Sequence, residues 1–305
     1  MKSTTFRADT LLLLAAAIWG SGFVAQRLGM KHVGPLTFTG VRFLLGALLL
    51  CPIIWLRKPA NAPNATTPNP GQLRTCLMGG CIAGTILFAG ALLQQIGIIT
   101  TTAGKAGFIT GLYVVLVPIL GLLVRQRTHA NTWIGAALAA VGLYLLSVTG
   151  SFEVNPGDVY IMCCAIVWAV HVLVIGRLSP RTDPLKLAAT QFAVAGVLGT
   201  AAALLAEQVT TADLMAAKWA IAYSGILSVG VAFTLQVVAQ RHAPPAHAAI
   251  LLSLEAVFAA IAGGLILGEA FETRELAGCG LMLAGMLASQ LRRSDQAEST
   301  EQSAQ

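Results

Sequence analysis

The chain has 305 residues, of which 56% are hydrophobic and 10% are charged, and its formal net charge is +6. About a quarter of the residues in typical soluble domains are charged, so this composition excludes an ordinary soluble domain and favours a protein dissolved in a lipid bilayer. A basic surplus in a membrane protein marks its cytoplasmic loops, and no nucleic-acid-binding motif competes with that explanation. We therefore expect a lipid bilayer as partner and no nucleic acid.

Ten apolar segments predict an all-α polytopic membrane protein, because a spanning helix needs about 20 mostly apolar residues. The first segment follows Lys2 and Arg7, as in a signal peptide, but it is long for one and lacks a convincing cleavage site, so we interpret it as a span. The polar residues 294–305 are expected to form a disordered cytoplasmic tail. The ten segments are 9–28, 35–56, 74–97, 103–124, 131–149, 157–176, 185–206, 217–239, 246–267 and 274–291.

Lysine and arginine are distributed unevenly over the loops between these segments. With the N-terminus inside and ten spans, thirteen of them lie in inside segments, five lie outside, and Arg42 lies within a span. Because cytoplasmic loops carry the excess of Lys and Arg, both termini are predicted to be cytoplasmic.

The sequence repeats itself across its two halves, which predicts two five-helix modules at 1–150 and 151–293. Five is odd, so the second module must be inverted relative to the first, a construction that secondary transporters use to open alternately to each side. With a shift of 149, Asp9 aligns with Asp158, Trp19 with Trp168 and Phe43 with Phe192; with a shift of 142, Gln94 aligns with Gln236, Leu112 with Leu254 and Tyr113 with Glu255; with a shift of 143, Gly135 aligns with Gly278 and Gly142 with Gly285.

Four apolar blocks carry a resemblance to the EamA-type family of the drug/metabolite transporter superfamily. They are AAAIWGSGFVAQR at 15–27, GVRFLLGALLL at 40–50, AGFITGLYVVLVPILGLL at 106–123 and AAILLSLEAVFAAIAGGLILGE at 248–269. The resemblance covers about residues 9–291 and implies a ten-helix carrier that exports small metabolites or toxic compounds by alternating access from a central cavity. We expect it in a bacterial-type cytoplasmic (inner) membrane. The family's second half usually has Leu-Glu-Pro, whereas Ala256 follows Glu255 here, so no proline kink is expected at that point.

Two charged residues inside spans are candidates for contacting the solute. Glu255 lies near the middle of the ninth span, where an ionised side chain costs about 2.5–3.5 kcal/mol. It is either a carboxylate that contacts the solute or a coupling proton, or a group whose hydrogen bond holds two helices together. Arg42 is the only basic residue well inside a span, and it either extends outward to the interface or pairs with Glu255.

Uncharged polar and aromatic side chains complete the predicted substrate site. The equivalent residues Gln94 and Gln236 can bind a solute or bridge helices, and bridging is the commoner use of such amides. Tyr113, Trp19, Trp168 and His171 are candidates for the cavity wall, with helix packing as the alternative for each. The substrate-binding prediction is thus Trp19, Arg42, Gln94, Tyr113, Trp168, His171, Gln236 and Glu255.

No motif for nucleotide binding, metal binding or nucleophilic catalysis occurs, and the six cysteines lie in or beside apolar runs. We therefore expect no metal, no cofactor, no catalytic residue and no enzymatic activity. The function predicted is a secondary transporter, an exporter of an amino acid or drug-like solute. A non-transporting membrane scaffold or receptor is the alternative, followed by a membrane enzyme. Gly278, Gly280 and Gly285 flatten one face of the last span, which could pack within the fold or against a second copy.

Overall fold

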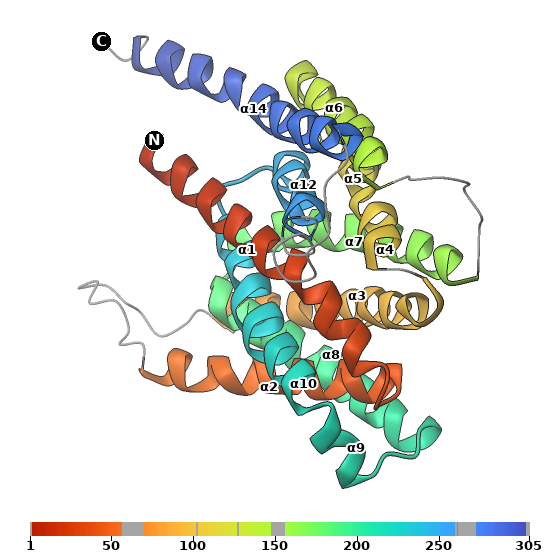
Figure 1. Cartoon of the computed structure of the whole chain (residues 1–305). Coiled ribbons are helices and arrows are strands. Elements are labelled where there is room, and N and C mark those ends of the chain that lie inside the picture. Colours follow the sequence, from red (N-terminus) through yellow and green to blue (C-terminus); the bar gives the residue numbers. More distant parts are fainter. Residues whose placement is uncertain are drawn as a thin grey trace.

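The computed structural model describes residues 2–56, 70–101, 103–126, 128–147, 156–259, 261 and 273–302, and the elements within these ranges are helical (Figure 1). The first half contains α1 (Lys2–Gly29), α2 (Pro35–Leu56), α3 (Pro70–Thr100), α4 (Ala103–Gly111), α5 (Tyr113–Leu123) and α6 (Ala130–Ser147). The second half contains α7 (Pro156–Leu178), η1 (Ser179–Arg181), α8 (Pro184–Ala206), α9 (Thr211–Ala216), α10 (Lys218–Ala222), η2 (Tyr223–Phe233), α11 (Thr234–Ala239), α12 (Pro245–Ser253) and α14 (Thr273–Gln302).

Long apolar helices dominate the structure. Among the described residues, seven helical segments are long and apolar enough to cross a membrane, and three shorter apolar helices occupy 130–145, 245–259 and 276–289. Together these segments overlap all ten predicted spans. The last residues of the predicted ninth span, 262–267, lie outside the described residues.

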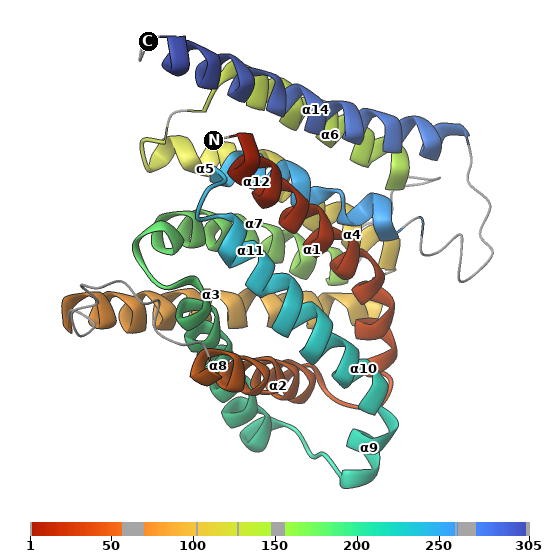
Figure 2. The same cartoon turned by 90° about the vertical axis from the view of Figure 1, so that its left-hand side faces the viewer.

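Helices from the two halves pack in pairs, and α6 lies beside α14 in Figures 1 and 2. A Cβ built on Gly285 would lie 2.6 Å from the Gly135 carbonyl oxygen, and one on Gly142 would lie 2.5 Å from that of Gly278. Gly135 near the start of α6 therefore touches Gly285 in the middle of α14, and Gly142 later in α6 touches Gly278 near the start of α14, so the helices run antiparallel. Their backbones approach so closely that only glycine fits.

These contacts place Gly278 and Gly285 within the fold rather than on a surface for a second copy. Gly280, on another face of α14, has no heavy atom within 4 Å of a built Cβ. The helix itself continues to Gln302 and so includes most of the tail that was expected to be disordered. Residues 294–302 contain two glutamates and two glutamines, which favour helix.

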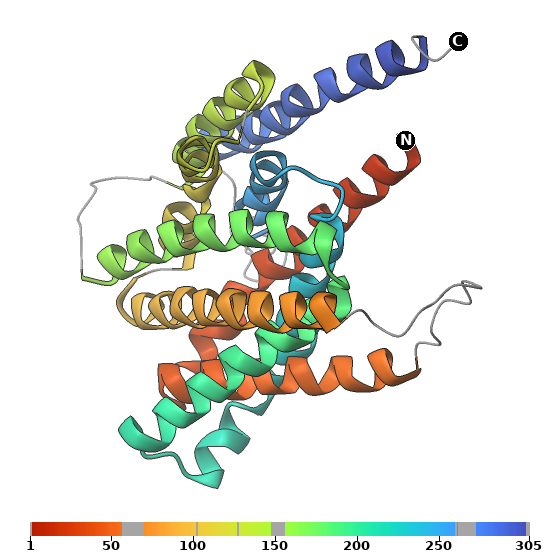
Figure 3. The ribbon, with the colours of Figure 1, turned by 180° about the vertical axis from the view of Figure 1, so that it is seen from behind.

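The chain ends lie at the same end of the molecule in all three views (Figures 1–3). A chain that begins and ends on one side of a layer crosses it an even number of times. The ten spans and the shared side of both termini stay predictions.

Helix breaks occur at equivalent positions in the two halves. The backbone N–H of Leu112 bonds the Ile109 carbonyl at 3.3 Å, and that of Leu254 bonds the Leu251 carbonyl at 3.2 Å. Each of these i→i−3 bonds is tighter than the α-helical pattern and ends its helix, α4 or α12. The second break forms although Ala256 replaces the family's proline.

The eighth predicted span changes its winding along its length. It begins as α10, continues as the π-helix η2 and ends as α11. The equivalent residues of the first half, 81–91, form ordinary α-helix within α3. π-helical segments are rare in proteins, and those that occur are often found at functional sites.

Buried polar contacts tie the ends of the helices together. His247 on α12 bridges two helices, with its Nε2 2.9 Å from Asp9 Oδ1 on α1 and its Nδ1 3.1 Å from Ser289 Oγ on α14. Asp158, the equivalent of Asp9, accepts a short hydrogen bond from the Thr101 hydroxyl at the end of α3. Equivalent aspartates thus anchor neighbouring helices in both halves.

Glu207, directly after α8, caps the start of α2. Its carboxylate accepts hydrogen bonds from the Leu36 N–H at 2.9 Å, the Thr37 N–H at 2.8 Å and the Thr37 hydroxyl at 2.7 Å. The first N–H groups of a helix have no partner within the helix, and its N-terminus favours a negative charge. This cap therefore joins α2 to α8 at one end of their contact.

We expect Glu207→Ala to lower the free energy of unfolding by about 1–2 kcal/mol, because the orphan N–H groups of α2 lose their charged acceptor. Glu207→Gln, which keeps a neutral acceptor of the same size, should lose less. Chemical unfolding of the purified protein in detergent measures both. Equal stability of Glu207→Ala and the parent protein would contradict this role.

The short helix α9 was not predicted, although its capping signal is visible in the sequence. The Thr210 hydroxyl accepts from the Asp213 N–H at 3.2 Å, and the Thr210 N–H donates to Asp213 Oδ2 at 2.9 Å, which is a capping box. Hydrogen bonds from the Thr210 hydroxyl and backbone hold the pKa of Asp213 below its ordinary value. The cap is therefore retained at pH values above the lowered pKa of Asp213. It weakens as the pH falls through that pKa and the carboxylate is protonated.

Candidate functional site

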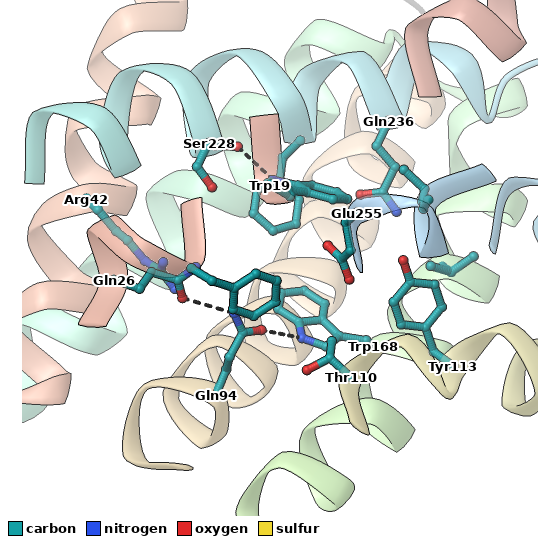
Figure 4. A pocket seen from close by; sticks show the side chains of 14 residues that line it. Trp19, Gln26, Arg42, Gln94, Thr110, Tyr113, Trp168, Ser228, Gln236 and Glu255 are labelled. Carbon is teal, nitrogen blue, oxygen red and sulfur yellow. Dashed lines mark hydrogen bonds between the residues drawn. The ribbon is translucent and has the colours of Figure 1, made fainter. Parts of the chain in front are cut away.

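A cavity lies where helices of both halves meet, with about 530 Å³ of empty space when the part open to the outside is included. Side chains from α1, α2, α3, α4, α5, α7, η2, α11 and the α12 region line it (Figure 4). Seven of the eight predicted substrate-binding residues are among them: Trp19, Arg42, Gln94, Tyr113, Trp168, Gln236 and Glu255.

His171, the eighth, does not line the cavity. It is completely buried, and its Nε2 lies 3.0 Å from Gln191 Oε1 on α8. Its ring also stands edge-on to Phe233, with the ring centroids 6.2 Å apart. These contacts join His171 on α7 to α8 and η2.

Seven further lining residues were not predicted. Gln26 is an amide in the interior of the first span, and its polarity was a usable signal. Thr110 is polar too, and its hydroxyl oxygen is buried without a hydrogen-bond partner. The apolar ones differ in no visible way from other apolar residues of the spans. The seven are Phe23, Gln26, Thr110, Val172, Ser228, Phe233 and Leu252.

Aromatic rings form one wall of the cavity around Phe233. The ring centroids of Trp19 and Trp168 lie 4.6 Å and 5.6 Å from that of Phe233. The centroids of Phe43 and Phe192 lie 6.0 Å and 6.2 Å from it. The two tryptophans are equivalent in the repeat, and so are the two phenylalanines. All four therefore surround the Phe233 ring. The residue equivalent to Phe233 in the first half is the much smaller Ala91.

Gln94 connects three helices at the edge of the cavity (Figure 4). Its Nε2 donates to Gln26 Oε1 on α1 at 2.9 Å, and its Oε1 accepts from Trp168 Nε1 on α7 at 3.0 Å. These two bonds join α1, α3 and α7, so Gln94 bridges helices in this conformation.

Gln236 is bound differently from its equivalent. Its Nε2 donates to Gln240 Oε1 at 3.1 Å, and Gln240 in turn donates to the Val172 carbonyl at 2.9 Å. The Oε1 of Gln236 is buried and has no hydrogen-bond partner among the described residues. Gln236 therefore presents a free acceptor beside the cavity.

Arg42 and Glu255 both line the cavity, but no ion pair joins them in the described residues. Each is only 4% exposed. Arg42 does not extend outward, because its guanidinium carbon lies over the rings of Phe38 and Phe43, at 5.4 Å and 5.1 Å from their centroids. The hypothesis that Arg42 and Glu255 neutralise each other by direct contact is therefore wrong for this conformation.

The helix breaks position the two equivalent residues Tyr113 and Glu255. Each is the first residue after its break, and each side chain projects into the cavity (Figure 4). Figure 4 shows the Tyr113 hydroxyl and the Glu255 carboxylate facing one another, and both side chains are buried. Interrupted helices near the centre of the fold are typical of the solute sites of secondary transporters.

Long apolar helices around a partly polar central cavity define the protein as a polytopic integral membrane protein. The sequence model of the EamA-like transporter family matches residues 6–148 and again residues 155–289. The chain belongs to this family. The two matches correspond to the two halves of the sequence repeat.

Curated relatives carry names of the same kind. An "Uncharacterized transporter" from Archaeoglobus fulgidus is 29% identical over 291 residues, covering 93% of this chain and 86% of that protein. The "Uncharacterized inner membrane transporter YedA" of Escherichia coli is 24% identical, covering 87% and 85%. The "Uncharacterized transporter YetK" of Bacillus subtilis is 25% identical, covering 92% and 86%.

A solved crystal structure has the same fold. It superposes with a TM-score of 0.72 at 18% identity and covers 94% of this chain and 98% of its own. At this identity the similarity shows the fold alone.

Proposed function

We propose that this protein is a secondary transporter with ten spans in two inverted five-helix modules. It exports a small organic solute, such as an amino acid or a drug-like compound, by alternating access. The observation that carries the proposal is the cavity between the modules, which both line with equivalent residues: Trp19 with Trp168, Gln94 with Gln236, and Tyr113 with Glu255.

Antiparallel packing of equivalent helices supports the inverted repeat. The fifth and tenth spans, α6 and α14, cross through Gly135, Gly142, Gly278 and Gly285 in opposite directions. The second and seventh spans do the same, since a Cβ on Gly40 would approach Thr200 and one on Gly196 would approach Leu44. Opposite directions of equivalent helices are what a two-fold axis in the membrane plane produces.

The proposed location is a bacterial-type cytoplasmic (inner) membrane with both termini in the cytoplasm. The Lys and Arg distribution and the shared end of the two termini support this orientation. A proton is the proposed coupling ion, because Glu255 is the one acidic residue among those that line the cavity. A homodimer would use surfaces other than the Gly278 and Gly285 face, which packs against α6.

Reconstituted vesicles test this function directly. We expect protein-dependent flux of at least one solute from a panel of amino acids and drug-like compounds, changed by an imposed proton gradient, with the solute recovered chemically unaltered. Thr110→Trp should block flux by filling the cavity, whereas Leu283→Trp on a 44% exposed position of α14 should not.

Two results would replace the proposal. Binding of solutes without flux in sealed, correctly inserted vesicles would favour the scaffold or receptor. Recovery of a chemically altered solute would favour a membrane enzyme.

A further inference from the structure

The Arg42 guanidinium is a buried cation that pairs with no carboxylate in the described part of the chain. No hydrogen bond or ion pair from the described part of the chain reaches it, and its Nε is buried with no acceptor. Its contacts are the faces of Phe38 and Phe43. Aromatic faces attract the charge but accept few of the five N–H bonds that a guanidinium can donate.

The unused donors face the cavity. Arg42 is one of the lining residues, and Figure 4 shows its side chain beside that of Gln26, pointing toward the space that Gln94 and Glu255 also border. A buried charge is costly unless it is paired and hydrogen-bonded. An acceptor that enters the cavity is therefore the natural partner of this group.

The acceptor best suited to a guanidinium is a planar carboxylate, which takes two parallel N–H bonds. A phosphate would bring a second negative charge. No second Lys or Arg would pair with that charge, since Arg42 is the only one among the lining residues. It would also approach Glu255, which lines the same cavity. One cation therefore favours a singly charged acid.

The rest of the cavity wall fits an apolar body. Trp19, Trp168 and Phe233 present clustered rings, and the indole N–H groups of both tryptophans are already bound, to the Ser228 carbonyl at 3.2 Å and to Gln94 Oε1 at 3.0 Å. These indoles therefore offer their rings and not their donors. Aromatic faces bury apolar groups and stack with other rings.

We propose that the solute is a small organic acid with one carboxylate, which binds Arg42, and an aromatic or other apolar body, which packs against Trp19, Trp168 and Phe233. This assignment rests on the proposed function, because it names the chemical class of the transported solute. It requires no amino group on the solute.

Four probes of nearly constant shape test the assignment by binding to purified protein in nanodiscs. They are 3-phenylpropanoate, its amino-substituted analogue phenylalanine, the neutral 3-phenylpropanamide and the cationic 3-phenylpropylamine. We expect both carboxylates to bind, and the amide and the amine to bind about 10- to 100-fold more weakly, as the loss of a charge-assisted contact predicts. Quenching of tryptophan fluorescence reports binding, since Trp19 and Trp168 line the cavity.

Variants of Arg42 assign any preference to this side chain. Arg42→Gln should bring the affinities for acid and amide to within about threefold of each other, and Arg42→Lys should restore part of the preference, because charge remains without the two-pronged geometry. Thermal unfolding of each variant shows whether it is folded, and the probe series on the parent protein decides the question if it is not. Equal or tighter binding of the amide or the amine, or an acid preference that survives in folded Arg42→Gln, would overturn the assignment.

Flux measurements with the same probes separate this assignment from the proposed function. Flux of the amide or amine but not of the acids would leave the transporter intact and refute the carboxylate assignment. Arg42-dependent binding of the acids without flux would retain the assignment and refute transport.

Discussion

Gln94→Leu should destabilise the protein by about 1–3 kcal/mol, whereas Gln95→Leu should leave its stability unchanged or raise it. Both glutamines are buried on α3, at 8% and 0% exposure. Gln94 bonds Gln26 and Trp168, so its loss leaves a buried acceptor and a buried donor unpaired. Neither side-chain polar atom of Gln95 has a partner, so leucine there removes an unsatisfied amide.

The two variants control for each other, because they make the same change one residue apart on one helix. Reversible unfolding in mixed detergent micelles gives the difference in free energy between them. The double variant Gln94→Leu, Gln26→Leu should recover part of the loss, since it removes one of the stranded groups. Equal stabilities of the two single variants would show that the Gln94 contacts do not hold α1, α3 and α7 together.

Gly285→Ala should lower the free energy of unfolding by about 1–3 kcal/mol, and Gly280→Ala on the same helix should raise it slightly. A Cβ at 285 would lie 2.6 Å from the Gly135 oxygen and 3.0 Å from the Ala139 nitrogen, which are backbone atoms that cannot turn aside. A Cβ at 280 meets nothing within 4 Å, so alanine there contributes only its better helix propensity.

The separation of α6 and α14 provides an independent measurement. Spin labels on the exposed faces of the two helices should report a larger distance in Gly285→Ala and an unchanged one in Gly280→Ala. If Gly285→Ala were as stable as Gly280→Ala with no change in distance, the close backbone contact would be refuted.

The helices were predictable because the bilayer demands long apolar runs, and the described helices overlap each predicted span. The internal repeat was predictable for a related reason, since modules with the same packing keep the same small and polar residues. It also identified the cavity: Trp19 with Trp168 and Tyr113 with Glu255 were equivalent in sequence and line one space.

Other features of the site depend on side-chain geometry that spacing does not specify. His171 shares a helix face with Trp168, yet it turns toward Gln191 on α8 and away from the cavity. Arg42 and Glu255 were judged to lie at similar depth, and depth alone does not bring two side chains into contact. Phe233 was indistinguishable from other apolar residues until neighbouring rings were seen to surround it.

The break after α12 shows where the absence of a residue was misleading. Without a proline after Glu255, no proline kink was expected at this point. Instead the Ser253 hydroxyl bonds the Ile250 carbonyl at 2.8 Å, a local contact that bends helices, and Leu254 makes a tight i→i−3 bond. A helix break therefore forms at Leu254 without a proline after Glu255.

The π-wound segment Tyr223–Phe233 makes the two modules unequal beside the cavity, because its equivalent in α3 is regular α-helix. Two identical modules could exchange their shapes without any change in energy, so an empty carrier would populate its inward-open and outward-open forms equally. Because one module contains the π-helix and the other does not, the inward-open and outward-open forms proposed for transport should differ in free energy. We therefore expect the empty carrier to favour one of these two forms, open to one side of the membrane, before any gradient acts on it.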